Sequence, residues 1–178
     1  MKLFSAKLCL SLLTLLLAAT ACRQQSAPRT VSTPTTTPAP TPYQLSAAGL
    51  QFELPADWTT SPARPRTVIV SSPDHELSVS FYEMVEKEQK IAKLLSAFNK
   101  DHSGVKKGAV KQGVFNGLPH TSQSGEATNT ITNKTFEWSI DTLTAKQPLV
   151  IYSQVNREAK DKYRRDYEKL ISSLRPIQ

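Results

Sequence analysis

Short runs of alternating apolar and polar residues recur along the chain after residue 49. In residues 77–82, Leu77, Val79 and Phe81 alternate with polar side chains. A period of two is typical of a half-buried β-strand, and β-branched runs favour strands as well. The pattern predicts strands at residues 50–54, 67–71, 77–82, 110–115, 118–127, 134–144 and 149–155.

Turn residues join the later strands in pairs. Asn116-Gly117 separates the fourth and fifth predicted strands, and tight hairpin turns favour this dipeptide. Residues 145–148, which end in a proline, separate the last two strands. Hairpins make neighbouring strands antiparallel. Gly104 and residues 106–108 predict a loop before the first hairpin.

Two stretches have a helical period instead. In residues 85–101 apolar side chains fall at i, i+3, i+4 and i+7, namely Ile91, Leu94, Leu95 and Phe98. Residues 158–174 carry a second apolar stripe, with Asn156 placed to cap the helix and Pro176 just past its end. The order of elements predicts an α+β fold, in which a largely antiparallel sheet of six or seven strands is covered by two helices.

Residues 1–21 follow a different pattern. Lys2 and Lys7 precede a leucine-rich run at 8–17, and small residues follow at 18–21. A charged start, an apolar run of about ten residues and a small-residue end are typical of a secretory signal. The run is shorter than the roughly 20 apolar residues that a membrane-spanning helix needs.

Cys22 directly follows these small residues, and Ala19-Thr20-Ala21-Cys22 resembles the lipobox of bacterial lipoproteins. The resemblance implies that residues 1–21 are removed as a signal peptide. It also implies that the Cys22 sulfur carries a diacylglyceryl group, often with a third acyl chain such as palmitate on the new N-terminus. Lipoboxes usually have leucine where this chain has Ala19. Cleavage of an ordinary secretory signal after Ala21 is the alternative, because Ala19 and Ala21 also fit its small-residue rule.

Lipidation of Cys22 has consequences for chemistry and location. The other cysteine, Cys9, lies in the removed segment, so the mature chain would have no disulfide and no free thiol. Attachment by two chains would be lasting, whereas one myristoyl chain binds only marginally. In bacterial lipoproteins Arg23, rather than Asp, after the cysteine favours the outer membrane. We therefore expect the cell envelope, at the periplasmic face of the outer membrane in a Gram-negative host.

Residues 22–42 are rich in proline and threonine and lack apolar periodicity. Without apolar surface to bury, nothing offsets the entropy of ordering the segment. We expect a disordered tether, whose prolines favour an extended chain of about 3.1 Å per residue and a reach of up to roughly 60 Å. A Pro-rich ligand for a partner is the alternative to a spacer. Residues 43–178 remain as one globular domain.

The net charge of the chain adds little to these predictions. The net charge is +7, but four of the 22 basic residues lie before residue 43, which leaves 18 against 15 acidic residues in the domain. We expect no nucleic-acid partner, because the charge is diluted and no aromatic residues are interleaved with it. The charge supports only weak attraction to anionic lipid headgroups or acidic polymers.

Several residues could carry chemistry. The histidines, which lack the spacing of a zinc site and are expected to be exposed, are His75, His102 and His120. Asp74 and His75 would need a serine to form a triad, and the candidates are Ser71, Ser72 and Ser122. No Gly-x-Ser-x-Gly nucleophile turn accompanies them.

Two further patterns are weak. Ser103 and Lys106 match S-x-x-K, but the intervening glycine disfavours the helical turn that this motif uses. Three acidic residues could converge as a carboxylate pair, namely Glu53, Asp57 and Asp141. No glycine-rich phosphate loop occurs. We therefore predict no catalytic residue, no cofactor and no metal site, and Cys22 is the one predicted site, for lipidation.

The domain resembles the PsbP/DcrB-type α/β/α sandwich in three short phrases. Residues 49–58 carry the opening phrase apolar-x-Phe-x-x-Pro-x-x-Trp, residues 116–119 carry a Gly-x-Pro turn, and residues 167–176 carry a closing helix with a Ser-Ser-apolar-Arg-Pro tail. The resemblance implies the sandwich fold. It also implies a role as a non-catalytic accessory or binding domain, since such domains are mostly of this kind and several bacterial ones are lipoproteins.

These observations lead to one functional hypothesis and two alternatives. The hypothesis is a membrane-anchored, non-catalytic envelope lipoprotein that binds an envelope protein partner as an accessory or assembly factor. One alternative is a small-ligand or lipid carrier, which requires an apolar cavity between the sheet and a helix. The other is a hydrolase of envelope polymers, which requires a convergent cluster of carboxylates or histidines in a pocket.

Overall fold

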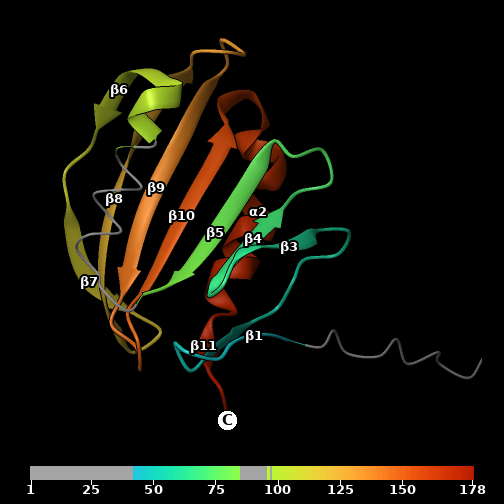
Figure 1. The fold of residues 1–178 in the computed structure, drawn as a ribbon, viewed down its shortest axis with the longest axis vertical. Coiled ribbons are helices and arrows are strands. Elements are labelled where there is room, and N and C mark those ends of the chain that lie inside the picture. Colours follow the sequence, from blue (N-terminus) through green and yellow to red (C-terminus); the bar gives the residue numbers. More distant parts are fainter. Residues whose placement is uncertain (1–41, 85–95, 97) are drawn as a thin grey trace, which may run out of the picture. The chain divides into compact units, whose positions relative to one another are not determined.

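An antiparallel sheet of eight strands is the centre of the fold. The structure is a computed structural model, and it describes residues 42–84, 96 and 98–178. The strand order is β3-β4-β5-β10-β9-β8-β6, and β7 pairs with the other half of β8 (Figure 1). The strand bounds are β3 Thr59–Arg64, β4 Thr67–Ser71, β5 Leu77–Glu83, β6 His102–Lys107, β7 Lys111–Phe115, β8 Leu118–Asn129, β9 Thr135–Leu143 and β10 Leu149–Asn156.

A second, three-stranded sheet brings the first and last strands of the domain together. Its order is β1-β2-β11, and the bounds are β1 Tyr43–Leu45, β2 Leu50–Phe52 and β11 Arg175–Pro176. Before β11 the chain forms a 3-10 turn, η1 (Arg157–Ala159), and the helix α2 (Lys160–Ser172). The helix lies behind the large sheet in Figure 1.

The two faces of the large sheet bury two separate cores, because successive residues of a strand point to opposite faces. On β10, Ile151 belongs to the core under α2, and its neighbour Val150 belongs to the core on the other face. Leu170 of α2 is fully buried in the first core. In the second, Phe98 from helical residues packs on Trp138, with ring centroids 5.6 Å apart. Helical residues therefore cover both faces of the sheet.

The predicted α+β fold with a largely antiparallel sheet is confirmed, with eight strands in the large sheet rather than six or seven. At the predicted hairpin turn, Asn116 and Gly117 have φ values of 48° and 80°, as tight turns at Asn-Gly require. The Asn156 side chain accepts a hydrogen bond from the backbone N–H of Glu158 at 3.2 Å, so it caps the 3-10 turn η1, whereas the N-cap of α2 itself is Ala159.

Some predictions lie outside the described residues. These are the signal, Cys22 and the tether up to residue 41, together with most of the predicted helix at 85–101. At the end of that helix, residues 98–101 are helical as predicted. Within the described residues no helix is long and apolar enough to cross a membrane.

The predicted loop around Gly104 is wrong, because β6 passes through it. The 12-residue strand β8 extends far enough to pair His102 with Asn129. The register shifts between Ser103 and Lys106, and Gly104 has a φ of 61°. This irregularity is a bulge, where glycine favours the left-handed backbone. A bulged edge strand thus has the glycine and lysine content that suggests a loop.

Candidate functional site

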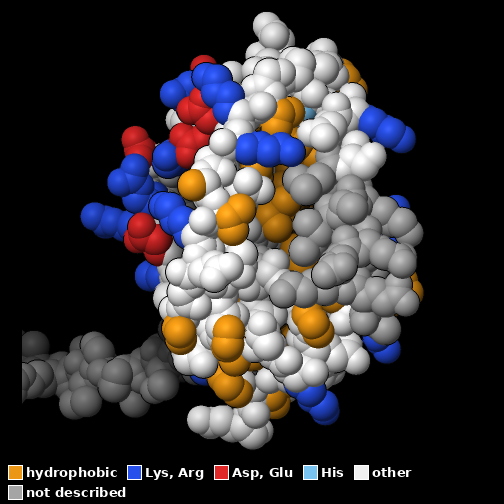
Figure 2. All heavy atoms as spheres, turned by 90° about the vertical axis from the view of Figure 1, so that its left-hand side faces the viewer, with side chains coloured by type: hydrophobic (Ala, Val, Ile, Leu, Met, Phe, Trp, Pro, Cys, Tyr) orange, Lys and Arg blue, Asp and Glu red, His pale blue; other side chains and the backbone are white. Residues whose placement is uncertain are grey.

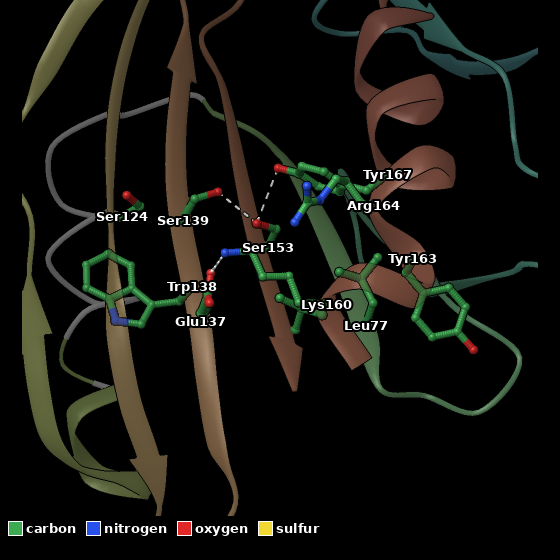
Figure 3. Close-up of a pocket in the computed structure, with 11 residues that line it drawn as sticks. Leu77, Ser124, Glu137, Trp138, Ser139, Ser153, Lys160, Tyr163, Arg164 and Tyr167 are labelled. Carbon is green, nitrogen blue, oxygen red and sulfur yellow. Dashed lines mark hydrogen bonds and ion pairs between the residues drawn. The ribbon is translucent and has the colours of Figure 1, made fainter. Parts of the chain in front are cut away.

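The candidate site is a groove between α2 and the β8–β9 half of the large sheet. It contains a cavity of about 230 Å³ and a smaller one of about 140 Å³, and Tyr167 of α2 lines both. Figure 3 shows the larger cavity, which is lined by serine side chains of the strands and by Lys160 and Arg164 of α2, with Lys160 paired to Glu137. The smaller cavity lies between Phe115 of β7 and α2. We call the two cavities together the α2 groove.

The floor of the α2 groove is polar because of the strand register. Ser124 of β8 lies opposite Ser139 of β9, which lies opposite Ser153 of β10. Residues two positions apart on a strand share a face, so Asp141 follows Ser139 on this floor. The same face turns apolar toward the core under α2, where Ile151 lies opposite Asp141.

A chain of hydrogen bonds runs across this floor. Asp141 Oδ1 lies 2.8 Å from His120 Nε2, and Asp141 Oδ2 accepts a hydrogen bond from Ser139 Oγ at 2.9 Å. The Ser139 and Ser153 hydroxyl oxygens are 2.7 Å apart, and the Tyr167 hydroxyl donates to Ser153 Oγ at 3.4 Å. Burial raises the pKa of Tyr167, so its hydroxyl keeps its proton at neutral pH.

The direction of this chain follows from counting protons. A serine hydroxyl has one proton, and that of Ser139 is used on Asp141. Ser153 must therefore donate to Ser139, and Tyr167 donates to Ser153. Every donor points toward Asp141, which accepts from both sides of its carboxylate.

This order of residues does not activate a nucleophile. In a catalytic triad the histidine stands between the serine and the aspartate, so that it can take the serine proton. Here Asp141 stands between His120 and Ser139, and the serine proton already lies on a carboxylate. The three residue types of a triad are present, but their arrangement orients side chains and does not prepare a reaction.

Ion pairs lie at the end of the α2 groove where η1 leads into α2. Glu126 and Glu137 lie directly opposite each other on β8 and β9, and like charges in such positions repel. Arg157 is 3.3 Å from Glu126, and Lys160 is 2.6 Å from Glu137. The cations offset the repulsion and tie η1 and α2 to the sheet. Charged side chains of both signs gather on the upper left of Figure 2.

Asp74, His75 and the nearby serines are not arranged as a triad. Ser72 Oγ donates to Asp74 Oδ1 at 2.9 Å, while Lys162 of α2 lies 2.7 Å from Asp74 Oδ2. The Lys162 hydrogen bond holds the pKa of Asp74 well below its usual range. His75 is exposed in a turn with a φ of 59°. Asp74 thus ties the β4–β5 turn to α2.

The other histidines are more buried than predicted. His75 is exposed as expected, but His120 is 22% exposed and ion-paired with Asp141. His102 is half-buried: its Nδ1 lies 2.9 Å from the carbonyl oxygen of Phe98, and the two rings stack with centroids 4.0 Å apart. No group of three or more metal-ligating side chains occurs among the described residues.

The remaining candidates do not converge. Glu53 pairs with Arg175 at 3.0 Å, and Asp57 lies in a turn with a φ of 65°. Asp141 bonds to His120 and Ser139 instead of to another carboxylate. Ser103 and Lys106 flank the bulge of β6 and share no helical turn.

The fold is similar to that of solved proteins. The structure of CyanoP, the cyanobacterial PsbP from Synechocystis sp. PCC 6803, matches 85% of this chain and all of its own chain, with 13% identity and a TM-score of 0.56. LpqN, involved in cell envelope biogenesis of Mycobacterium tuberculosis, matches 75% of this chain and 88% of its own, with 11% identity and a TM-score of 0.47. No protein-family model and no curated protein matches the sequence. The likeness to CyanoP shows that the domain has the PsbP-like fold.

Proposed function

We propose that this chain is a membrane-anchored lipoprotein of the bacterial envelope whose PsbP-like domain binds a protein partner without catalysis, as an accessory or assembly factor. The anchor is the lipidated Cys22, at the periplasmic face of the outer membrane in a Gram-negative host. Residues 22–42 are the tether that lets the domain reach its partner. The signal-like start, the small residues before the cysteine and the proline content support this part of the proposal.

The hydrogen bonds around Asp141 are the observation that supports a role without catalysis. A hydrolase would need a nucleophile or an acid–base pair with free valences facing a substrate. In the α2 groove the hydroxyl protons of Ser139, Ser153 and Tyr167 are already directed within the protein. Fixed polar groups beside aromatic surface in a concave site suit recognition.

The division of the α2 groove into two small cavities, of about 230 and 140 Å³, favours a protein partner over a carried lipid. Pockets for small ligands usually enclose about 300–1,000 Å³, whereas the larger cavity holds about 230 Å³. A space of that size suits one anchoring side chain of a partner, which is how many interfaces concentrate their binding energy. Native mass spectrometry of the purified protein tests the alternative, since a carrier would retain a ligand of defined mass.

Site-specific photo-cross-linking in cells tests the proposal. A photoreactive residue at Ser124, which is exposed at the larger cavity, should capture the same protein reproducibly. The matched control is the same residue at Thr59, which is exposed on β3 at the opposite edge of the sheet. Capture at neither position, or equal capture at both, contradicts a partner at the α2 groove.

A further inference from the structure

The two edges of the large sheet differ in how well they are protected. β3, at one edge, contains Pro62, which has no N–H to offer, and its pairing with β4 is irregular after that proline. Such features keep other strands from adding to an edge. At the other edge, β7 is regular and contains no proline. Among the described residues its pairing partner is β8.

The backbone of β7 presents hydrogen-bonding groups on its outer side. Val114 lies opposite Pro119 of β8, and the carbonyl of Pro119 accepts from the N–H of Thr144 on the β9 side. In an antiparallel pair both residues point toward each other or both point away. The N–H and C=O groups of Val114 therefore point away from β8, and those of Gln112, two residues earlier, do the same.

The side chains of this edge are basic and partly apolar. Residues 102–125 contain three lysines and no acidic residue. Lys107 and Lys111 are exposed, whereas Lys106, also exposed, lies 3.6 Å from Glu126 of β8. Val114 is 75% exposed and Val110 is 56% exposed. Figure 2, which looks onto this side of the molecule, shows hydrophobic side chains at the surface.

Lysine alone can serve to protect an edge, but the rest of β7 does not fit that role. A protected edge has no need for a valine that is three-quarters exposed beside backbone groups that no other described strand pairs with. β7 also borders the α2 groove, because Phe115 lines the smaller cavity and Lys111 lies opposite Ser122 of the same floor strand. An added strand would therefore extend the sheet beside the α2 groove, the surface that we propose binds the partner.

We propose that the outer side of β7 accepts an extended acidic segment of the partner protein as an added strand. This inference rests on the proposed function and names the chemistry of the partner. Lys111 and Val114 point to opposite faces of the sheet, so the segment has an acidic residue beside Lys111 and an apolar one beside Val114. A second copy that pairs through its own β7 is a poorer occupant, because residues 102–125 carry the same lysines and no acidic residue.

A synthetic probe tests the site directly. The probe is a nine-residue peptide of alternating glutamate and valine, and the full-length protein is purified in detergent. Binding should slow hydrogen exchange at the amides of Gln112 and Val114 and should weaken as salt rises. A peptide with lysine in place of glutamate should bind at least tenfold more weakly.

Matched variants separate strand addition from side-chain attraction. Val114→Pro removes an outward N–H that takes no part in the pairing of β7 with β8, and prolines are tolerated at such edge positions. It should bind the peptide about fivefold more weakly, the effect of one hydrogen bond of about 1 kcal/mol. Val114→Thr, which keeps the N–H and the branched side chain, should bind within twofold of the original protein. Lys111→Glu should weaken binding and flatten its salt dependence, whereas Lys146→Glu, on the β9–β10 turn, should not.

Four results would overturn the inference. These are unchanged peptide binding by Val114→Pro, equal binding of the lysine peptide, displacement of the peptide by phosphatidylglycerol vesicles, and protection of β7 by self-association of the protein. Photo-cross-linking in cells distinguishes this inference from the proposed function. If Ser124 captures a partner and Val114→Pro leaves that capture unchanged, this inference fails while the proposed function stands.

Discussion

Removal of one hydroxyl from the floor of the α2 groove tests the direction of its hydrogen bonds. Ser139→Ala deletes the acceptor of the Ser153 proton and one donor to Asp141. Ser153 is only 8% exposed, so its hydroxyl is left buried without its acceptor, which costs about 1–3 kcal/mol. For a domain of residues 43–178 this loss lowers the melting temperature by about 3–10 °C.

The reverse deletion should cost less. In Ser153→Ala the proton of Ser139 keeps its place on Asp141, and the long bond from Tyr167, at 3.4 Å, is lost. We expect a loss of about 0.5–1.5 kcal/mol, the value of an ordinary hydrogen bond. The control is Ser124→Ala, an exposed serine in the same row, which should stay within about 0.5 kcal/mol of the original protein.

Urea-induced unfolding, followed by tryptophan fluorescence, measures these free energies because both tryptophans are buried. The Ser139→Ala/Ser153→Ala double variant should be little less stable than Ser139→Ala alone, since it no longer contains the unsatisfied Ser153 hydroxyl. If Ser153→Ala costs as much as Ser139→Ala, the inferred direction of the hydrogen bonds is wrong. If both cost under about 0.5 kcal/mol, these hydrogen bonds do not stabilise the groove.

Three further predictions concern the scaffold. Asp74 has a folded-state pKa below its ordinary value of 3.8, so its contribution to stability is present above about pH 4 and is lost as the pH falls; unfolding curves of Asp74→Asn should depend less on pH there. Phe81→Ala, at a fully buried ring stacked on Phe52 at 4.6 Å, should cost about 3–5 kcal/mol in urea unfolding. Asn156→Ala removes the cap of η1 and the hydrogen bond from Asn156 to Glu76, and it should cost about 1–2 kcal/mol in the same assay, with circular dichroism showing whether helix is lost.

Periodicity predicted those strands and helices whose faces are clearly apolar. The alternation at 77–82 and the β-branched run at 67–71 became β5 and β4, and the Asn116-Gly117 turn was fixed by its local chemistry. The strands β1, β3 and β11 were not predicted, because they are short or contain Pro62. Pairing with other strands in the folded domain makes them strands. β6 was not predicted for a different reason. Its glycine and lysine content suggests a loop, and it is a strand because the 12-residue β8 is long enough to pair with it.

The candidate site was less predictable than the fold. The alternation of residues could place Ser139 and Asp141 on one face, and a histidine could be expected on the neighbouring strand. Only the register sets His120 within reach of Asp141 and aligns Ser139 with Ser153. A one-residue shift would send these side chains to opposite faces. Sequence spacing therefore suggested exposed histidines, whereas strand pairing places His120 against Asp141 and the Phe98 ring stacks on His102.

The mass and location of the protein with and without the Cys22 sulfur test the central claim, that the domain works from a lipid anchor. The original protein should fractionate with the envelope, and its intact mass should exceed that of residues 22–178 by the attached acyl groups. Cys22→Ser should lose both the added mass and the envelope association. If Cys22→Ser still partitions with the envelope at an unchanged mass, apart from the exchanged side chain, the protein is not held by a lipid on Cys22.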